Sequence, residues 1–472
     1  MAESPHTPAS TAVTSRIGLG EKLAYVLANI GNIPVMVTLS TFLLLFYTDV
    51  VGLDPVAIGT LFLIARVLDG VSDPIMGYII DHLPPTRLGR FRGYLILGAL
   101  LTSLNFALVF LGPSLAPAGK LAIAYVSYLL LGWLFDLMDI PLNSMLAVMT
   151  DDDGQRSTLS TLKGITYTVG AVVVTAAVLP IIDMFPIRQE GFHVVIVAIA
   201  VLVAVFSVVG ALGIRERVFP IHGEESYKIR DIVKILGAKA VLSLFATTIL
   251  QQVGAGVASG IGVFFYLYVL KRPDLYPLAA LAFLVGAVVA VLVVKPMLHR
   301  LGKKVTVAIA LSISALGGLI ALLLPANQPM LFIALSMITA PGVGLFMLIS
   351  YAVQADNMDY VEWKLGFRAE AAVSSMNSFI VKAGSGVGAA IGAYSLAAIG
   401  YVANAPEQSA GTIRGLYLIN FGVPGILGVV AVAIWLLTYP LTRARLAEMK
   451  SDLAERRAER GMDVPETVSA SA

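Results

Sequence analysis

The sequence predicts an all-α membrane protein whose twelve transmembrane helices form two six-helix bundles. Three observations predict this fold class: the chain is 58% hydrophobic, it is only 13% charged, and its mean hydropathy is +0.86. An ordinary soluble domain carries about 25% charged residues. Because roughly 20 apolar residues cross a hydrocarbon core about 30 Å thick, a chain of 472 residues has room for many spans.

Gly, Pro and charge clusters divide the chain into twelve apolar segments. The segments begin near Lys22, Val56, Gly93, Leu121, Ser160, Val194, Val233, Pro277, Val305, Leu331, Ala371 and Leu416. The longest internal polar stretch, residues 215–239, separates six segments from six. We therefore expect a cytoplasmic tail at 1–20, bundles at 21–215 and 233–441, a central cytoplasmic loop at 216–232 and a second cytoplasmic tail at 442–472.

The basic residues predict the orientation of the helices. With both termini in the cytoplasm, about 25 Lys and Arg residues lie on the cytoplasmic side and about five lie outside. The basic residues assigned to the outside are Lys120, Arg188, Lys271, Arg272 and Arg414. This asymmetry favours cytoplasmic termini.

A weak internal repeat supports two related halves. Residues 77–90 after the second segment, GYIIDHLPPTRLGR, share an Arg-Leu-Gly-basic pattern with residues 295–304 after the eighth, KPMLHRLGKK. A repeat of six helices is expected for the major facilitator fold, in which the substrate site lies between the halves near the midplane.

Several classes of function conflict with the composition. The absence of cysteine excludes disulfides, thiolate metal sites and cysteine nucleophiles. The five histidines lie in tails or near helix ends, which argues against haem or zinc. A net charge of +2 argues against nucleic acid as a partner, and no phosphate-binding Gly-Lys-Ser/Thr loop is present. We expect no cofactor and no structural metal, and a protein that acts as a monomer in a lipid bilayer.

Asp69 and Asp73 lie four residues apart inside the second apolar segment and share one helix face. A charged side chain inside the hydrocarbon core costs free energy, so these acids should face the protein interior or a water-filled cavity. With the hydroxyl of Ser72 they form a hard-oxygen site suited to sodium. Two neighbouring carboxylates also repel each other, and a proton relieves that repulsion, so a proton site is equally plausible. The alternative is a structural ion pair between Arg66 and Asp69, which leaves Asp73 unpaired.

The fourth and eleventh segments carry further charges inside the membrane. Asp136 and Asp139 share one face, and a carboxylate in a wet cleft suits the hydroxyls of a sugar. Lys382 needs an anion, and the carboxylates of the second and fourth segments are available. Asn32 could hydrogen-bond a polar solute and Trp133 could stack on a sugar ring, although both residue types also serve in helix packing.

Four separated motifs resemble one family of carriers. They are Tyr47-Thr-Asp49-Val-Val-Gly52-Leu, Ala65-Arg66-Val-Leu-Asp69-Gly-Val-Ser-Asp73-Pro74-Ile-Met-Gly77, Met138-Asp139-Ile-Pro141 and Ala355-Asp356-Asn-Met-Asp359-Tyr360-Val-Glu362-Trp363-Lys364-Leu-Gly366-Phe-Arg368-Ala-Glu370. In this order, from about residue 18 to 439, they resemble the glycoside-pentoside-hexuronide:cation symporters.

The resemblance implies roles for individual residues. Asp69, Asp73 and Ser72 would bind the cation, Asp139 would contact the sugar close to the cation, and Lys382 matches a buried lysine of helix 11. Lys163 would replace a basic residue near the sugar. The cytoplasmic motif residues would form charge pairs that latch the outward-facing state: Asp81, Arg90, Asp356, Asp359, Glu362 and Arg368. A bacterial cytoplasmic membrane is the implied location.

Three positions depart from the family's best-known pattern. Asn32 stands where an aspartate is expected, Asn143 replaces an aromatic residue, and Asp136 replaces a neutral hydroxyl residue. The first two argue against a galactoside, and the extra acid favours protons slightly. We predict a cation-coupled sugar symporter driven by sodium or protons. A carrier of a non-sugar or amphiphilic solute is the alternative, followed by an intramembrane enzyme, which the scattered acids do not favour.

Overall fold

The computed structural model describes residues 17–217 except Leu83, Pro85 and Asp151, and then residues 234–366 and 370–459; a few helical side chains, Asp81 among them, are also outside the description. The central loop predicted at 216–232 and the ends of both tails therefore lie mostly outside the described residues. Within the described ranges the regular elements are helices.

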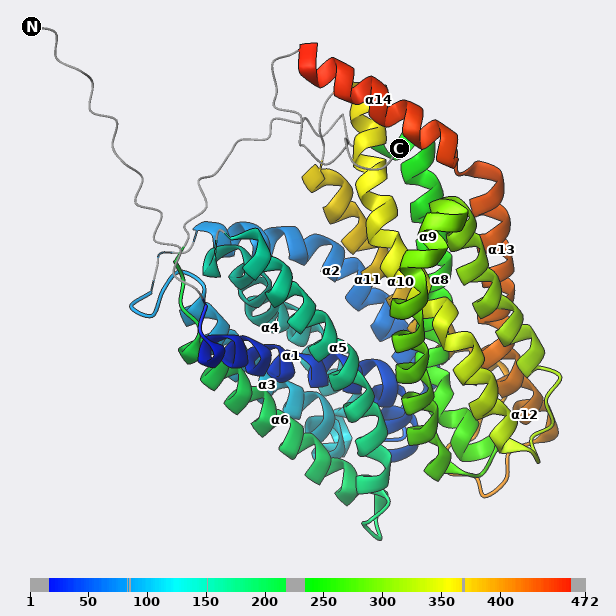
Figure 1. Ribbon diagram of the computed structural model, residues 1–472. Helices are drawn as coiled ribbons and strands as arrows, with labels where there is room; N and C mark the ends of the chain where they lie inside the picture. Colours follow the sequence, from blue (N-terminus) through cyan, green and yellow to red (C-terminus); the bar gives the residue numbers. More distant parts are fainter. Residues whose placement is uncertain are drawn as a thin grey trace, which may run out of the picture.

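The helices follow the predicted order. The first half of the molecule comprises α1 (Leu19–Leu45), α2 (Pro55–His82), α3 (Arg92–Leu115), α4 (Lys120–Met149), α5 (Asp153–Ile182) and α6 (Arg188–Gly213). The second half comprises α8 (Lys239–Phe264), α9 (Tyr276–Ala321), α10 (Pro329–Leu365), α11 (Glu370–Ala398), α12 (Ala410–Tyr417) and α13 (Val423–Thr438). A further helix, α14 (Arg443–Glu459), follows α13 (Figure 1).

Ten described segments are long and apolar enough to span a membrane. One of them, Pro273–Ala321, has 49 residues, about twice the length of a single span. It bends at Gly302, whose positive φ of 74° is readily adopted only by glycine. The segments predicted to begin near Pro277 and Val305 are thus joined in one bent helix. With α2, which is long enough but interrupted by Arg66, Asp69 and Asp73, these helices provide the twelve predicted spans.

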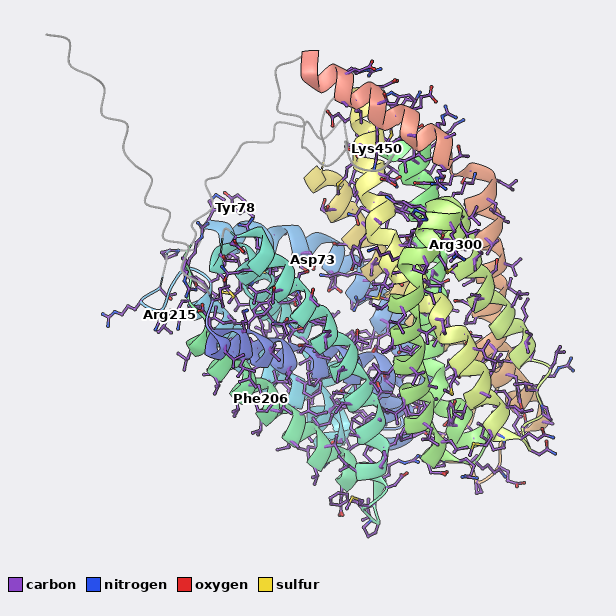
Figure 2. The ribbon with its side chains drawn as sticks, in the orientation of Figure 1. Asp73, Tyr78, Phe206, Arg215, Arg300 and Lys450 are labelled. Carbon is purple, nitrogen blue, oxygen red and sulfur yellow. The ribbon has the colours of Figure 1, made fainter. Side chains whose placement is uncertain are left out.

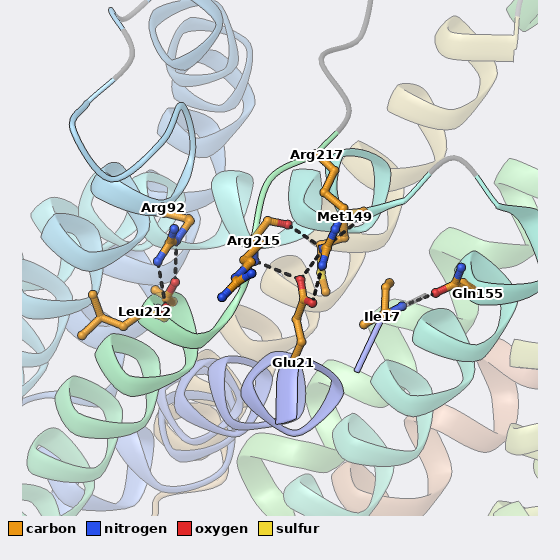
Figure 3. Close-up of polar contacts among 9 residues, drawn as sticks. Ile17, Glu21, Arg92, Met149, Gln155, Leu212, Arg215 and Arg217 are labelled. Atoms are coloured by element: carbon orange, nitrogen blue, oxygen red, sulfur yellow. Dashed lines mark hydrogen bonds and ion pairs between the residues drawn. The ribbon is translucent and has the colours of Figure 1, made fainter. Parts of the chain in front are cut away.

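Polar contacts join the predicted cytoplasmic ends of the first half (Figure 3). The Glu21 carboxylate of α1 accepts hydrogen bonds from the Arg215 backbone N–H at 3.0 Å and from the Arg217 guanidinium at 2.5 Å. This hydrogen bond raises the pKa of Arg217 above its usual value. The Arg92 guanidinium of α3 donates to the carbonyls of Ala211 and Leu212 at the end of α6. The first half is therefore fixed at this end independently of the second.

One cluster of buried side chains begins at Ile17 and runs along the first half. Among the described residues, the second half joins this cluster near the predicted outer ends, through Phe264, Leu396 and Ile419. A separate cluster, from Ile235 to Leu453, contains residues of the second half alone and includes Trp435 and the α14 residue Met449. Figure 1 shows the helices of the two halves as two groups that converge at the lower side of the view, away from α14.

Candidate functional site

Asp69 forms an ion pair with Arg66 of its own helix, α2. The Arg66 guanidinium lies 3.1 Å from Asp69 Oδ2, so the ion pair considered as an alternative is present. It does not leave Asp73 unpaired, because Asp73 has a partner on another helix. The buried Ser72 hydroxyl donates to the Asp69 backbone carbonyl at 3.5 Å and contacts no carboxylate in the described hydrogen bonds.

Lys382 of α11 joins acids from two helices of the first half. Its ammonium lies 2.5 Å from Asp73 Oδ2 on α2 and 3.9 Å from Asp136 Oδ1 on α4. The second oxygen of Asp136, Oδ2, is buried and has no hydrogen-bond partner among the described residues. Burying a carboxylate oxygen without a hydrogen-bond donor costs free energy. Binding of a cation or a proton would compensate that cost, so this oxygen is available to either.

The packing of α2 against α11 brings these charges together. Gly386 lies directly against Arg66, since a β-carbon at Gly386 would lie 1.9 Å from Arg66 Cδ. A β-carbon at Gly70 would lie 2.9 Å from the ring of Phe379, and one at Gly59 would lie 3.0 Å from the ring of Tyr394. The absence of side chains at these three positions lets the helices approach closely enough for Lys382 to reach Asp73.

Asp139 belongs to a second group of polar side chains. Its Oδ1 accepts from the Asn32 amide of α1 at 3.1 Å, and its Oδ2 accepts from the Asn143 amide at 2.8 Å. The Lys163 ammonium of α5 donates to Asn143 Oδ1, and Tyr167 donates to Asn32 Oδ1 at 2.7 Å. The structure therefore brings together Asn32, Asp139, Asn143 and Lys163, four of the six predicted solute-site residues.

The remaining two predicted solute-site residues, Trp133 and Lys382, make no described hydrogen bond with this group. Trp133 precedes Asp136 by one turn of α4 and is 38% exposed. Lys382 contacts Asp73 and Asp136 and makes no described hydrogen bond with Asp139. Of the predicted cation-site residues, Asp73 and Asp136 share a partner, while Asp69 and Asp139 each have separate partners.

The site lies between the halves and on the predicted cytoplasmic side of their mutual contacts. Figure 2 shows Asp73 in the interior, between the helices of the first half and those of the second. The other described hydrogen bonds between the halves are at the predicted outer ends, for example between Thr60 and Tyr394 at 3.0 Å and from Ser259 to the Ser40 carbonyl at 3.1 Å. With the predicted orientation, this distribution of contacts is the one expected of an inward-facing carrier.

Two of the predicted cytoplasmic charge residues, Asp356 and Arg90, have described contacts within one half. Asp356 accepts from Lys303 at 2.6 Å and lies 3.8 Å from Lys450 of α14. The Arg90 backbone N–H donates to Glu216 at 2.7 Å. Asp359 and Glu362 follow on α10, and each makes a polar contact. The Asp81 side chain and Arg368 lie outside the described residues.

Sequence reasoning missed two sets of polar residues. Tyr167 lies four residues after Lys163 on the same face of α5, and this spacing could have indicated it. Asp49 was part of a motif but had no assigned role, and it accepts hydrogen bonds from Tyr268 and Tyr401 of the second half. No local pattern predicts that contact, because the partners lie more than 200 residues away.

Comparisons with known proteins agree with the predicted resemblance and fold. Residues 24–443 match the family model described as MFS/sugar transport protein. The isoprimeverose transporter of Lactiplantibacillus pentosus is 30% identical over 97% of this chain and 96% of the relative. The glucuronide carrier protein homolog of Escherichia coli K12 is 29% identical over 92% and 95%, respectively. The crystal structure of the nucleoside transporter NupG has a TM-score of 0.64 at 14% identity and covers 88% of this chain and 99% of that one, a likeness of fold.

Proposed function

The chain belongs to the MFS/sugar transport protein family, and from this premise we propose that it is a symporter that couples inward flow of sodium or protons to uptake of a sugar. It is a multi-pass membrane protein of a family of transporters, not of enzymes. A glycoside, pentoside or uronide is the proposed solute class, supported by relatives named for isoprimeverose and glucuronide. The proposed location is a bacterial cytoplasmic membrane, with both termini inside.

The observation that carries the proposal is the bond from Lys382 to Asp73. It joins α11 of the second half to α2 of the first, beside the Asp136 oxygen that has no hydrogen-bond partner among the described residues. A sodium ion or proton bound by Asp73 and Asp136 competes with the ammonium of Lys382, because each of these cations is attracted to the same carboxylate oxygens. Cation binding thereby changes a contact between the halves, as coupled transport requires.

The group around Asp139 is the proposed solute site. Asp139 lies one turn after Asp136 on α4, so a solute bound there lies close to the cation. Its carboxylate orients two amides, and Lys163 adds a cationic donor. Acceptors and donors of this kind suit the hydroxyl groups of a sugar, and the ammonium also suits a carboxylate.

Uptake into proteoliposomes tests the proposal. Purified protein is reconstituted, and radiolabelled isoprimeverose, methyl glucuronide and methyl galactoside are offered under an imposed sodium gradient or an imposed pH gradient. We expect one of the first two solutes to accumulate above its external concentration with one of the gradients, and the galactoside not to. Failure of both cations to drive accumulation of any sugar, with a folded protein, would overturn the proposal.

A further inference from the structure

The first helices of the two halves end in the same way. After α1 the chain forms one wide turn of π-helix, Phe46–Val50 (FYTDV), and after α8 it forms another, Phe265–Val269 (FYLYV). The bond from the Val51 N–H to the Phe46 carbonyl corresponds to the bond from Leu270 to Phe265, both 3.0 Å long. Gly52 and Lys271 then take positive φ angles of 68° and 52°. Asp49 and Tyr268 therefore occupy equivalent positions, 219 residues apart.

Equivalent residues of α1 and α8 also meet in space. Ser259 donates to the carbonyl of its counterpart Ser40, and the Tyr268 hydroxyl donates to its counterpart Asp49. Residues that contact their own equivalents mark the axis that relates two similar units. Asp49 thus lies where the halves must separate if the outer side opens.

Asp49 is a buried acid whose donors come mainly from the other half. Tyr268 donates to its Oδ2, Tyr401 to its Oδ1 at 2.7 Å, and the Asn404 amide to its backbone carbonyl at 2.5 Å. Thr48 is the donor from its own half, at 2.8 Å. Among the described residues, no basic side chain lies within ion-pair distance of Asp49.

These donors are well suited to hold a carboxylate in place. Burial, followed by the charge of Asp49, raises the pKa of Tyr401 far above its usual range, so that its hydroxyl remains a donor. Asn404 adopts a left-handed φ of 57°, which asparagine tolerates better than most residues. Because Asp49 lies at the negative end of the α1 dipole, its charge depends on these donors or on water.

We propose that Asp49 is a positioning residue of the transport cycle: with Tyr268, Tyr401 and Asn404 it forms an outer latch that holds the outer side shut while the cation and solute sites open to the cytoplasm. This inference rests on the proposed function, because a latch has a role only in a carrier that alternates. Opening of the outer side replaces the three donors of the second half by water around the Asp49 carboxylate and carbonyl.

A cysteine reporter tests the outer latch without any solute or cation gradient. The chain has no cysteine, and Ala390 of α11 is 1% exposed and lies one turn from both Gly386 and Tyr394, which face α2. In the Ala390→Cys protein, in vesicles of known orientation, a membrane-impermeant maleimide added on the outer side should react slowly. Asp49→Asn should raise that rate at least tenfold and leave the rate from the cytoplasmic side unchanged or lower.

Matched variants separate a latch from general loosening. Asp54→Asn changes an acid five residues on, which accepts a hydrogen bond from Val56 of its own half, and should leave the rate unchanged. Tyr401→Phe, which retains the acid, should raise the rate less than Asp49→Asn and should add little to it in the double variant, because both act on one bond.

The proposal is overturned if the Asp49→Asn rate equals that of the parent, or if reaction accelerates equally from both sides. If Asp49→Asn does not fold, the labelling rate of the Tyr401→Phe variant tests the outer latch alone. A labelling rate equal to that of the parent would then overturn the proposal. Labelling needs no transport substrate, so an unsuccessful uptake panel and an absent latch are distinguishable.

Discussion

At the scale of single residues, the interior charges form two neighbouring groups of ion pairs. Arg66 is paired with Asp69, and Lys382 is shared between Asp73 and Asp136. The Asp136 oxygen that has no hydrogen-bond partner among the described residues is the strongest candidate for a cation ligand. Asp139 is set apart, with both carboxylate oxygens bound by amides.

The first prediction concerns Asp73. Asp73→Asn should abolish cation-driven uptake, because a neutral amide does not bind the coupling cation in competition with the Lys382 ammonium. It should also lower the free energy of unfolding by about 1–3 kcal/mol, because the ammonium loses its nearer charged partner. Uptake under an imposed gradient and thermal unfolding measure the two effects. Asp274→Asn, at an exposed acid paired with Arg272 two residues away, should transport like the parent. Gradient-driven accumulation by Asp73→Asn would refute the cation site.

The second prediction concerns Asp139. Asp139→Asn should weaken solute binding by about 10- to 100-fold, because each charge-assisted hydrogen bond contributes about 1.5–3 kcal/mol and the Asn32 and Asn143 amides lose their common acceptor. Isothermal titration of the solute found in the uptake panel measures the affinity. Unchanged affinity would remove Asp139 from the solute site.

At the scale of helices, close packing decides which charges can meet. The contact of α2 with α11 depends on glycines that leave room for Arg66, Phe379 and Tyr394. The bend of α9 at Gly302 and the wide turns at the ends of α1 and α8 depend on backbone conformations that the apolar pattern does not indicate.

The third prediction concerns Gly386. Gly386→Ala places a methyl group against Arg66, and overpacking of this kind costs about 1–3 kcal/mol, so the variant should unfold at a lower temperature and transport more slowly. Gly77→Ala on α2 is the matched control, because no described neighbour lies within 4 Å of a β-carbon at this position and alanine favours a helix by about 0.5–1 kcal/mol. Equal melting temperatures for the two variants would contradict close packing at Gly386.

At the scale of the whole molecule, the two halves touch at the predicted outer ends, and ion pairs hold each half together separately at its predicted cytoplasmic end. Glu21 with Arg217 secures the first half, and Asp356 with Lys303 secures the second. The residues that the second half contributes to the buried cluster shared by both halves, such as Leu396 and Ile419, lie near the predicted outer ends. Motion of one half against the other therefore needs the outer contacts to break and leaves these ties intact.

The fourth prediction concerns orientation. Ala403→Cys, in the exposed loop after α11, should react with an impermeant maleimide added outside intact cells, and Ser451→Cys on α14 should react only after the membrane is opened. The physical reason is the excess of basic residues on the predicted cytoplasmic side. Mass-tag gels read out both positions, and the reverse pattern would invert the topology.

The sequence by itself determined the spans, their number and the family, because apolar length, glycine and proline positions and ordered motifs are local properties of the chain. It also identified most of the interior polar residues, since a charge within an apolar segment is visible without any partner. Only the tertiary structure decided that Lys382 binds Asp73, that Asp139 is held by Asn32 and Asn143, and that Asp49 meets Tyr268 and Tyr401. Each of these contacts depends on the relative position of helices distant in sequence, which is set by side-chain packing between them and not by the periodicity of any one helix.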